Sequence, residues 1–461
     1  MPNLTIEFAD LIIKVSQNKI TDEVAECVTY KVLDYIGCAA AGTSINSQKM
    51  KILVDNSGQG NVPVIGSVIK LNNLSAALMN GINAHKTELD DGHRIAMLHP
   101  GVPVISALLS YAYTNKINGY DFVRGIVAGY ETTVRLGEAI QPGHKLKGFH
   151  ATGSCGTIGA AVSIAIAAHY SQEQLLSTLS AASTSACGLL EMIDDDSEIK
   201  PYNAGRAALD GLASALIGKA NFIGPKDPLG GKRGFFAGYC ENINTENLLS
   251  NETLWNKSKL KIFSCYQKPF AACRHCHAPI EAILQLRNKH KIKASEVKKI
   301  TIKTYKLAIL GHESAEINSI SAAKMSIPFS VAIAFVTGRA NLDEFSERYL
   351  FHSEVKDLMK KVFIVESPEL TIASPDKRGA IVEVLTEKDI FSITVDYPLG
   401  EPENPLTSTL LIQKFKELCE FSGIEKKIIS SVILHTANLK NDFELFLESL
   451  SSLRRVYETN Y

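Results

Sequence analysis

The chain has 461 residues, 48 lysines and arginines against 49 aspartates and glutamates, and a hydrophobic content of 45%. A net charge of −1 with 21% charged residues argues against a dedicated nucleic-acid-binding protein, which carries a basic excess. The same composition excludes a disordered chain, and at roughly 100–200 residues per domain it predicts two or three domains.

The N-terminus and the cysteines indicate a cytoplasmic protein. The first ten residues carry Glu7 and Asp10, where a secretory signal peptide has a basic segment followed by an apolar run. The nine cysteines are odd in number and lie mostly on apolar helical patterns, as free buried thiols do. We therefore expect a protein of the reducing cytoplasm that contacts neither membrane nor nucleic acid.

Apolar residues recur at helical spacing from Thr5 to about residue 265, which predicts a large helical bundle. Thr21 is expected to cap one of these helices. Asn118-Gly119 marks a turn before another, and Ser171 with Gln174 forms a capping box before a third.

One uncharged segment, from Ala151 to Ala168, could suggest a membrane span. Glycines, serines and threonines interrupt it, and only Ile158 to Ala168 is solidly apolar, well short of the roughly 20 residues that a span needs. We predict a buried helix that packs closely against its neighbours through small residues.

Past residue 290 the hydrophobic period changes from helical to alternating. The alternation predicts strands over residues 297–304, 380–385 and 393–395. Residues 386–389 are expected to form a hairpin connection, and residues 343–362 a helix. After several prolines, helical spacing returns from Leu406 to Leu450.

These patterns predict a mainly α protein with a smaller α+β domain. We expect a large all-helical domain made of residues 1–268 and 405–461, with the smaller α+β domain, residues 269–404, inserted in it. Ligand sites preferentially occur where two domains meet.

The densest polar cluster lies between Asn83 and Gly101. It contains three histidines, three acids and two bases: His85, Lys86, Glu88, Asp90, Asp91, His93, Arg94 and His99. A solvated surface loop is one interpretation, because charged runs are ordinarily exposed. The other is an acid/base site that also holds cationic groups for an anionic substrate.

A metal site is a further alternative for this cluster. Its acceptable ligands are His85, Asp90, His93 and His99. Their spacing matches no established pattern such as His-Glu-x-x-His, so we expect no metal there.

Two shorter segments also carry polar side chains into apolar surroundings. His150 stands at the start of the predicted buried helix, where backbone N–H groups favour an anion, although a structural histidine is an equal alternative. Lys200 precedes a proline, and by itself it indicates a loop lysine.

The segment from Lys268 to His277 contains Cys273-x-x-Cys276-His277, the pattern of c-type haem attachment. That attachment occurs in exported proteins, so we expect no haem. A thioredoxin-like function is disfavoured because the surrounding strand and helix pattern is missing. What remains is a basic, imidazole-rich loop at the predicted domain junction.

Together and in this order, the four segments resemble the MmgE/PrpD family, which includes 2-methylcitrate dehydratase, cis-aconitate decarboxylase and iminodisuccinate epimerase. The likeness covers nearly the whole chain. The matching motifs are Asn-Gly-x-x-x-His, Leu-Asp-Asp and His-Pro-Gly within Asn80–Gly101, Gly-Phe-His-x-Thr at Gly148–Thr152, Lys-Pro-x-x-x-Gly at Lys200–Gly205, and Lys-x-Phe with Cys-x-x-x-His at Lys268–His277.

The resemblance implies a homodimeric lyase or isomerase without metal or cofactor. Its substrate would be a small di- or tricarboxylate, bound in the cleft between the domains. The residues expected to be catalytic are His99, Glu88, Asp91, His150, Lys200 and Lys268. Those expected to bind substrate are His93, Arg94, Cys273, Arg274 and His277.

His99 is the preferred acid/base, with Glu88 or Asp91 orienting it and His150 as second choice. Lysines and Arg274 would neutralise the substrate carboxylates and the charge that develops beside them.

The chain departs from the family pattern at three positions. Members that dehydrate or decarboxylate tend to carry Asp near Glu88, Thr near Gly92, and Tyr where this chain has Phe329. The loss of the tyrosine hydroxyl removes a proton donor or a carboxylate contact.

The sequence therefore favours a hydro-lyase that abstracts a proton α to a carboxylate and expels a β-hydroxyl, as 2-methylcitrate dehydratase does. The alternatives are an epimerase or isomerase of an imino- or hydroxy-dicarboxylate, a decarboxylase of the cis-aconitate type, and a catalytically inactive carboxylate-binding protein.

Overall fold

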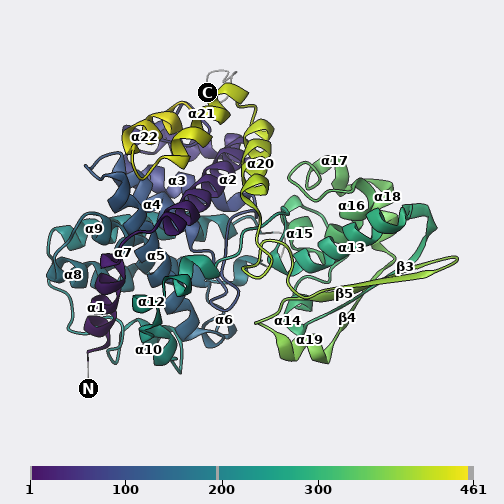
Figure 1. Ribbon diagram of the computed structural model, residues 1–461, viewed down its shortest axis with the longest axis horizontal. Helices are drawn as coiled ribbons and strands as arrows, with labels where there is room; N and C mark the ends of the chain where they lie inside the picture. The colour runs from purple at the N-terminus through teal and green to yellow at the C-terminus, as the bar shows by residue number, and fades with distance from the viewer. Residues whose placement is uncertain (1–2, 194–196, 455–461) are drawn as a thin grey trace. The chain divides into compact units, whose positions relative to one another are not determined.

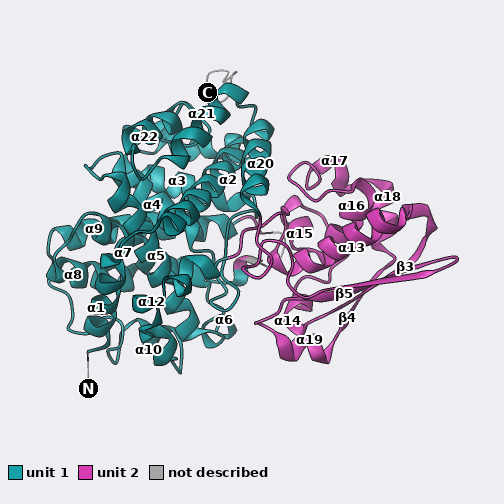
Figure 2. Ribbon diagram, viewed as in Figure 1, with its two compact units in different colours: residues 1–191, 199–265, 407–461 teal, residues 192–198, 266–406 magenta. Residues whose placement is uncertain are grey.

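The computed structural model describes residues 3–193 and 197–454, which form two compact units (Figure 2). Unit 1 contains residues 1–191, 199–265 and 407–461, and unit 2 contains residues 192–198 and 266–406. The expected fold class, mainly α with a smaller α+β part, is confirmed.

Unit 1 is a bundle of helices. They are α1 (Leu4–Gln17), α2 (Asp22–Asp55), α3 (Asn73–Lys86), α4 (Gly101–Ala112), α5 (Gly119–Ile140), α6 (Gly143–Leu146), α7 (Ala151–Ala167), α8 (Gln172–Ser185), α9 (Lys200–Lys219), α10 (Phe235–Tyr239), α11 (Thr245–Leu249), α12 (Glu252–Trp255), α20 (Ser408–Phe421), α21 (Lys426–Ala437) and α22 (Phe443–Ser451). Figure 1 shows the yellow C-terminal helices α20 and α21 beside the purple α2, which they contact.

The expected helix starts are confirmed by their caps. Thr21 accepts the backbone N–H of Val24 at the start of α2, and Asn118 accepts that of Asp121 at the start of α5. Ser171 caps α8 with both hydrogen bonds of a capping box. A small antiparallel strand pair that the periodicity did not predict, β1 (Gln59–Pro63) with β2 (Lys70–Leu71), lies between α2 and α3.

Helix α7 is the centre of unit 1, as its uncharged sequence predicts. All 17 of its residues are buried, and it packs against α4, α5, α8 and α9. The small residues permit close approach: a Cβ on Gly159 would stand 1.7 Å from the hydroxyl of Thr133 on α5. In the part of the chain that the structure describes, no helix is long and apolar enough to cross a membrane.

Unit 2 is built on one four-stranded sheet in the order β4-β3-β5-β6. Its strands are β3 (Val297–Thr304), β4 (Val362–Glu366), β5 (Ala380–Thr386) and β6 (Ile390–Val395). β3 and β4 are parallel, and the other pairs are antiparallel. The hairpin expected at residues 386–389 joins β5 to β6, closed by hydrogen bonds between Thr386 and Asp389.

Helices cover this sheet. They are α13 (His277–His290), α14 (Lys306–Ile309), α15 (Ile320–Met325), α16 (Ile327–Thr337), α17 (Glu347–Leu350), α18 (Ser353–Met359) and α19 (Pro368–Ala373). α13 packs on β5 and β6, while α14 contacts β4 and α19 (Figure 1).

The expectation of one helix over residues 343–362 is wrong. Two short helices, α17 and α18, occupy part of the segment, and His352 between them has extended backbone angles. Val362 already belongs to β4, an edge strand that is mostly exposed. Such a strand lacks the alternation of apolar and polar residues by which strands are recognised. The helical spacing of the preceding residues therefore extended the predicted helix into β4.

A buried ion pair ties α5 to the segment after it. The Arg135 guanidinium, 0% exposed, donates to Glu131 at 2.7 Å and to Thr253 and two backbone carbonyls. Glu131 also accepts the backbone N–H of Lys261. Removal of one partner would leave the other charge buried and uncompensated.

We therefore expect Arg135→Leu to lower the free energy of unfolding by about 3–5 kcal/mol. The control is Lys51→Leu, because the Lys51–Asp55 pair has the same i,i+4 spacing but is about half exposed. That substitution should change stability by less than about 1 kcal/mol. Urea unfolding followed by circular dichroism measures both, and equal losses in the two variants would contradict the argument.

Candidate functional site

The centre of the predicted polar cluster is a carboxylate shared by two imidazoles. Asp90 Oδ2 lies 2.8 Å from Nδ1 of His85 and 3.2 Å from Nδ1 of His99. The two rings stand edge to face with centroids 4.8 Å apart. His85 and Asp90 are buried, whereas the His99 side chain is 14% exposed and is the most accessible of the three. The cluster is therefore an internal site and not a solvated loop.

The hydrogen bonds of His99 define its tautomer. Nδ1 lies 2.6 Å from the backbone carbonyl of Asp91, and a carbonyl oxygen only accepts, so Nδ1 carries the proton. In the neutral ring the lone pair is then on Nε2. A histidine held by a carboxylate through Nδ1 can take a proton at Nε2, and the carboxylate stabilises the imidazolium that results.

Three of the sequence motifs meet at this site. His85 lies in the last turn of α3 and His99 just before α4, and the backbone N–H of His99 donates to Thr152 Oγ1 on α7 at 3.1 Å. α3 packs directly on α9: a Cβ on Gly81 would stand 2.6 Å from Cα of Gly205. The glycines of these motifs thus allow the close packing that positions the polar residues.

The electrostatics of Asp90 follow from its partners. Burial would raise the pKa of this carboxyl, but the neighbouring His85 and His99 imidazoles outweigh burial and hold the pKa well below its usual range. Asp90 is therefore the anion of the site. Among the described residues, its Oδ1 and His85 Nε2 are buried without a hydrogen-bond partner, and they offer positions for polar groups of a substrate.

Asp91 acts as a structural support. Its Oδ1 accepts the backbone N–H of Gly101 at the start of α4, and its Oδ2 accepts the hydroxyl of Tyr130 and lies 3.5 Å from the Lys31 ammonium. Burial raises the pKa of Asp91, and Lys31 offsets part of that rise. The backbone carbonyl of Asp91 contacts His99 Nδ1, while the carboxylate beside His99 belongs to Asp90, and the orienting role of Asp91 stays a prediction.

Glu88 and Lys200 form a second pair near the first. Lys200 begins α9, and its ammonium donates to the Glu88 carboxylate, so it is not the loop lysine that its local sequence indicates. Glu88 has φ +58°, a left-handed conformation uncommon for a residue with a side chain. Such strain tends to occur at functional sites, where the surrounding structure maintains it.

His150 precedes α7 as its N-cap residue and faces the same group. Its ring centroid lies 6.4 Å from that of His85, and its Nδ1 is 3.5 Å from the Asn203 amide. Burial, with His85 and Lys200 close by, lowers the pKa of His150 well below its ordinary value. His150 is therefore a neutral imidazole at neutral pH.

His93 is turned toward other partners. Its Nδ1 accepts the backbone N–H of Ala96, and its Nε2 lies 3.0 Å from Ser264 Oγ and 3.5 Å from Glu138. These contacts hold the loop, and substrate binding by His93 stays a prediction. Arg94 is partly exposed.

In unit 2, Arg274 is committed to internal partners. Its guanidinium, 3% exposed, binds Glu401 at 2.9 Å and the backbone carbonyls of Pro398 and Leu399. It also donates to His277 Nδ1, and His277 Nε2 donates to the carbonyl of Ala272. These polar atoms stabilise the loop, and substrate binding by Arg274 and His277 stays a prediction.

The remaining expected residues of unit 2 lie in or near the same loop. Lys268 is 1% exposed, Cys273 is half-buried, and Phe329 is buried near the start of α16. Phe329 packs against Phe345 with ring centroids 5.7 Å apart, so the position where the family pattern led us to expect a tyrosine is apolar here.

The sequence reasoning missed four residues that the structure brings into clusters. Asp90 and His85 were placed in the polar cluster, among the metal-ligand alternatives and in the family motifs, but neither was named as a catalytic residue. His275 and His312 join Cys273 in unit 2, where the three ligand atoms lie within 4.8 Å of one another. His312 is 39 positions from Cys273, and no local signal links the two.

Two groups of side chains contain the kinds of ligand atoms that could hold a metal ion. His85, Asp90 and His99 could ligate an ion, but their Nδ1–H groups are already directed at Asp90 Oδ2. That arrangement suits proton transfer better. Cys273, His275 and His312 form the second group.

Comparison with known proteins supports the resemblance over both halves of the chain. A family model described as the MmgE/PrpD N-terminal domain matches residues 6–247, and one described as the MmgE/PrpD C-terminal domain matches residues 270–435.

Three relatives align over most of this chain. The cis-aconitate decarboxylase of Aspergillus terreus is 26% identical, with 97% of this chain and 96% of that protein covered. A second cis-aconitate decarboxylase of that species is 25% identical with the same coverage. A cis-aconitate decarboxylase-like protein of Aspergillus oryzae is 24% identical, with 90% of each chain covered.

The charge of Asp90 should appear in the pH dependence of stability. Its pKa is lower in the folded protein than in the unfolded chain, so its contribution is complete above the unfolded value of about 3.9 and is lost as the pH falls through the folded pKa. We expect Asp90→Asn to lose about 1.5–3 kcal/mol at neutral pH and to show a weaker decline on acidification.

Urea unfolding between about pH 7 and pH 3 measures this difference. The control is Asp357→Asn, because Asp357 is exposed and pairs with Lys360 in solvent, where screening leaves little stability to lose. Identical acid profiles for wild type and Asp90→Asn would contradict the assignment of Asp90 as a stabilising anion.

Proposed function

The chain belongs to the MmgE/PrpD family, and on that premise we propose that it is a lyase that acts on a small di- or tricarboxylate without an organic cofactor. The observation that carries the proposal is the Asp90–His99 pair, whose geometry leaves His99 Nε2 as the base. Proton transfer at a carbon beside a carboxylate is the step that this pair can perform.

In the proposed reaction, His99 Nε2 removes the proton from the carbon α to a substrate carboxylate. The electron pair of that C–H bond forms a carbon–carbon double bond while the β C–O bond breaks. The leaving hydroxyl takes a proton from the Lys200 ammonium and departs as water. The imidazolium then releases its proton to solvent, and the lysine amine regains one.

Charge supports this assignment. Asp90 stabilises the His99 imidazolium after proton abstraction, and Glu88 holds the Lys200 ammonium in place. His150, neutral at neutral pH, is the second candidate acid/base and can also donate a hydrogen bond to the substrate. In unit 2, Lys268 and Cys273 stay proposed substrate contacts.

A second candidate reaction is decarboxylation, which the relatives favour. All three relatives described above carry cis-aconitate decarboxylase in their names. Loss of carbon dioxide leaves an electron pair on carbon, and a protonated His99 can supply the proton that this carbon accepts. Phe329 and Gly92 distinguish this chain from the family pattern, and they point to a different substrate from that of the relatives.

We also propose that the protein is a homodimer of the cytoplasm, as the resemblance to the family implies. Sedimentation equilibrium of the purified protein tests the dimer: a mass of one chain across the micromolar range would contradict it.

The first test of activity is proton NMR of the chelator-treated protein in deuterated water with citrate, 2-methylcitrate, cis-aconitate, malate-type hydroxy acids and imino-dicarboxylates. New olefinic signals with loss of a hydroxy acid are expected for the hydro-lyase. Loss of a carboxylate instead identifies the decarboxylase, and deuterium uptake alone identifies an isomerase. Thermal stabilisation by a tricarboxylate without turnover would replace the lyase by a carboxylate-binding protein.

With the substrate in hand, His99→Gln should lower kcat by roughly 10²–10⁴-fold, because it removes the general base and leaves the fold intact. The matched control is His169→Gln, since His169 is 58% exposed and its Nε2 lies 2.9 Å from Asp121, as an imidazole beside a carboxylate outside the site. If folded His99→Gln keeps wild-type turnover, His99 is not the base, and His150 or His85 would take that role.

A further inference from the structure

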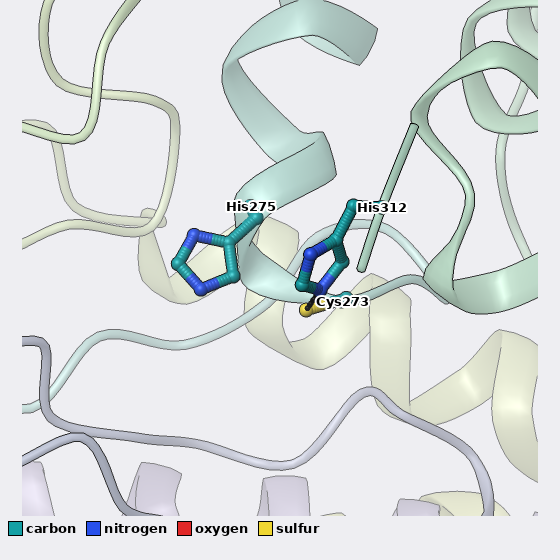
Figure 3. Close-up of side chains that lie close together, drawn as sticks. All are labelled: Cys273, His275 and His312. Atoms are coloured by element: carbon teal, nitrogen blue, oxygen red, sulfur yellow. Dashed lines mark hydrogen bonds between the residues drawn. The ribbon is translucent and has the colours of Figure 1, made fainter. Parts of the chain in front are cut away.

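Unit 2 contains a cluster of one thiol and two imidazoles that the proposed reaction does not require as a unit. Figure 3 shows Cys273, His275 and His312 side by side, with the cysteine sulfur directed at a ring nitrogen of His312. Sγ of Cys273 lies 3.2 Å from His312 Nε2, and the two rings lie 4.9 Å apart. Both imidazoles are buried, and the cysteine is half-buried.

Hydrogen bonds define the orientation of His312. Its Nδ1 lies 2.9 Å from the carbonyl of Leu310, which only accepts, so Nδ1 carries the proton and the Nε2 lone pair is directed at the sulfur. A ring held at Nδ1 by a backbone carbonyl is the usual arrangement around metal-binding histidines, because that bond orients the ring and raises the basicity of Nε2.

His275 has a corresponding partner. Its Nδ1 lies 2.6 Å from the hydroxyl of Tyr305, which is 1% exposed and follows β3 directly. When Nδ1–H donates to the tyrosine oxygen, Nε2 carries the lone pair. Both histidines are thus held through Nδ1 by a protein group, which is the condition under which Nε2 coordinates.

The backbone around the cluster is also tied down. The N–H of Cys273 donates to the carbonyl of Lys324, and the carbonyl of His312 accepts the N–H of Ile327 at the start of α16. Two separate segments therefore bring their side chains to one point, the turn before α13 and the turn after α14, and backbone hydrogen bonds to Lys324 and Ile327 hold both.

We propose that Cys273, His275 and His312 form a binding site for a divalent transition ion of the zinc type. One thiolate and two imidazoles are ligands that select borderline-soft ions such as Zn²⁺ and Co²⁺ over Mg²⁺ and Ca²⁺. Three protein ligands leave the fourth tetrahedral position to water or another group. The ion would stabilise unit 2 by joining the turn before α13 to the turn after α14, and the proton transfers assigned to unit 1 do not depend on it.

The distances fit this ion after a small adjustment. With Zn–S near 2.3 Å and Zn–N near 2.0 Å, two tetrahedral ligands lie roughly 3.5 Å apart. The 3.2 Å between sulfur and His312 Nε2 is close to that value, and all three ligand atoms lie within 4.8 Å. Closure therefore needs His275 to approach by roughly 1 Å, within the reach of a side-chain rotation.

The thiol of Cys273 also lies beside His312 Nε2 when no metal is bound, and transfer of its proton to that nitrogen would form an ion pair. A metal-free thiolate–imidazolium pair of Cys273 and His312 is therefore the competing state, and the experiment has to separate it from the metal site.

The test is titration of the full-length, reduced and chelator-treated protein with Co²⁺, followed by absorption spectroscopy. We expect one equivalent of Co²⁺ per chain, with an intense thiolate-to-cobalt charge-transfer band that Zn²⁺ abolishes by displacement. Zn²⁺ should also raise Tm of the wild type. This readout is metal binding, so it does not depend on the proposed lyase activity.

Variants assign the ligands. Cys273→Ser should lose the charge-transfer band, whereas Cys276→Ser, a buried cysteine in the same turn, should keep it. Tyr305→Phe removes the partner of His275 Nδ1 and should weaken Co²⁺ binding by roughly 10–100-fold with the band retained. Circular dichroism verifies that each variant is folded.

Three results would overturn the proposal. The first is a folded wild type that binds no Co²⁺ while Cys273 reacts unusually fast with a thiol reagent, which identifies the metal-free pair. The second is an undiminished band in Cys273→Ser. The third is equal loss of the band in Cys273→Ser and Cys276→Ser, which would place the metal on the Cys-x-x-Cys pair.

Discussion

The structure of unit 1 depends on the burial of one carboxylate, Asp90, between two imidazoles. An isolated carboxylate cannot be buried at reasonable cost, so it must be matched by donors that are themselves held in place. His85 comes from the end of α3 and His99 from the start of α4, and Thr152 on α7 holds the backbone of His99. The packing of α3, α4 and α7 thus positions the groups that surround the charge of Asp90.

Two clusters of similar residue types differ in chemistry because their partners differ. In unit 1 the Asp90 carboxylate lies beside Nδ1 of both imidazoles, although His99 Nδ1 also contacts a backbone carbonyl, and this carboxylate would stabilise a ring protonated at the opposite nitrogen. In unit 2 the imidazoles are held by a carbonyl and a phenol, and a thiol lies beside one Nε2. The hydrogen-bond partners of each imidazole, more than the residue types, distinguish an acid/base centre from a group of ligands for a soft metal ion.

Arg274 and His93 illustrate how distant partners limit what a local pattern can predict. Arg274 and His93 belong to residue types that bind carboxylates, and their sequence neighbourhood is polar, yet Glu401 and Ser264 occupy their polar atoms. Those partners lie 127 and 171 positions away along the chain. A local pattern predicts which side chains could act, whereas distant partners decide which of them are already used.

Hydrophobic period, helix caps and small residues act over a few positions, so the fold class, the helix starts at Thr21, Asn118 and Ser171, and the buried helix α7 could be predicted from the sequence. The sharing of Asp90, the pairing of Glu88 with Lys200 and the contact of His312 with Cys273 depend on the folded structure. Such choices depend on burial and on hydrogen-bond geometry between distant segments, which exist only after the chain has packed.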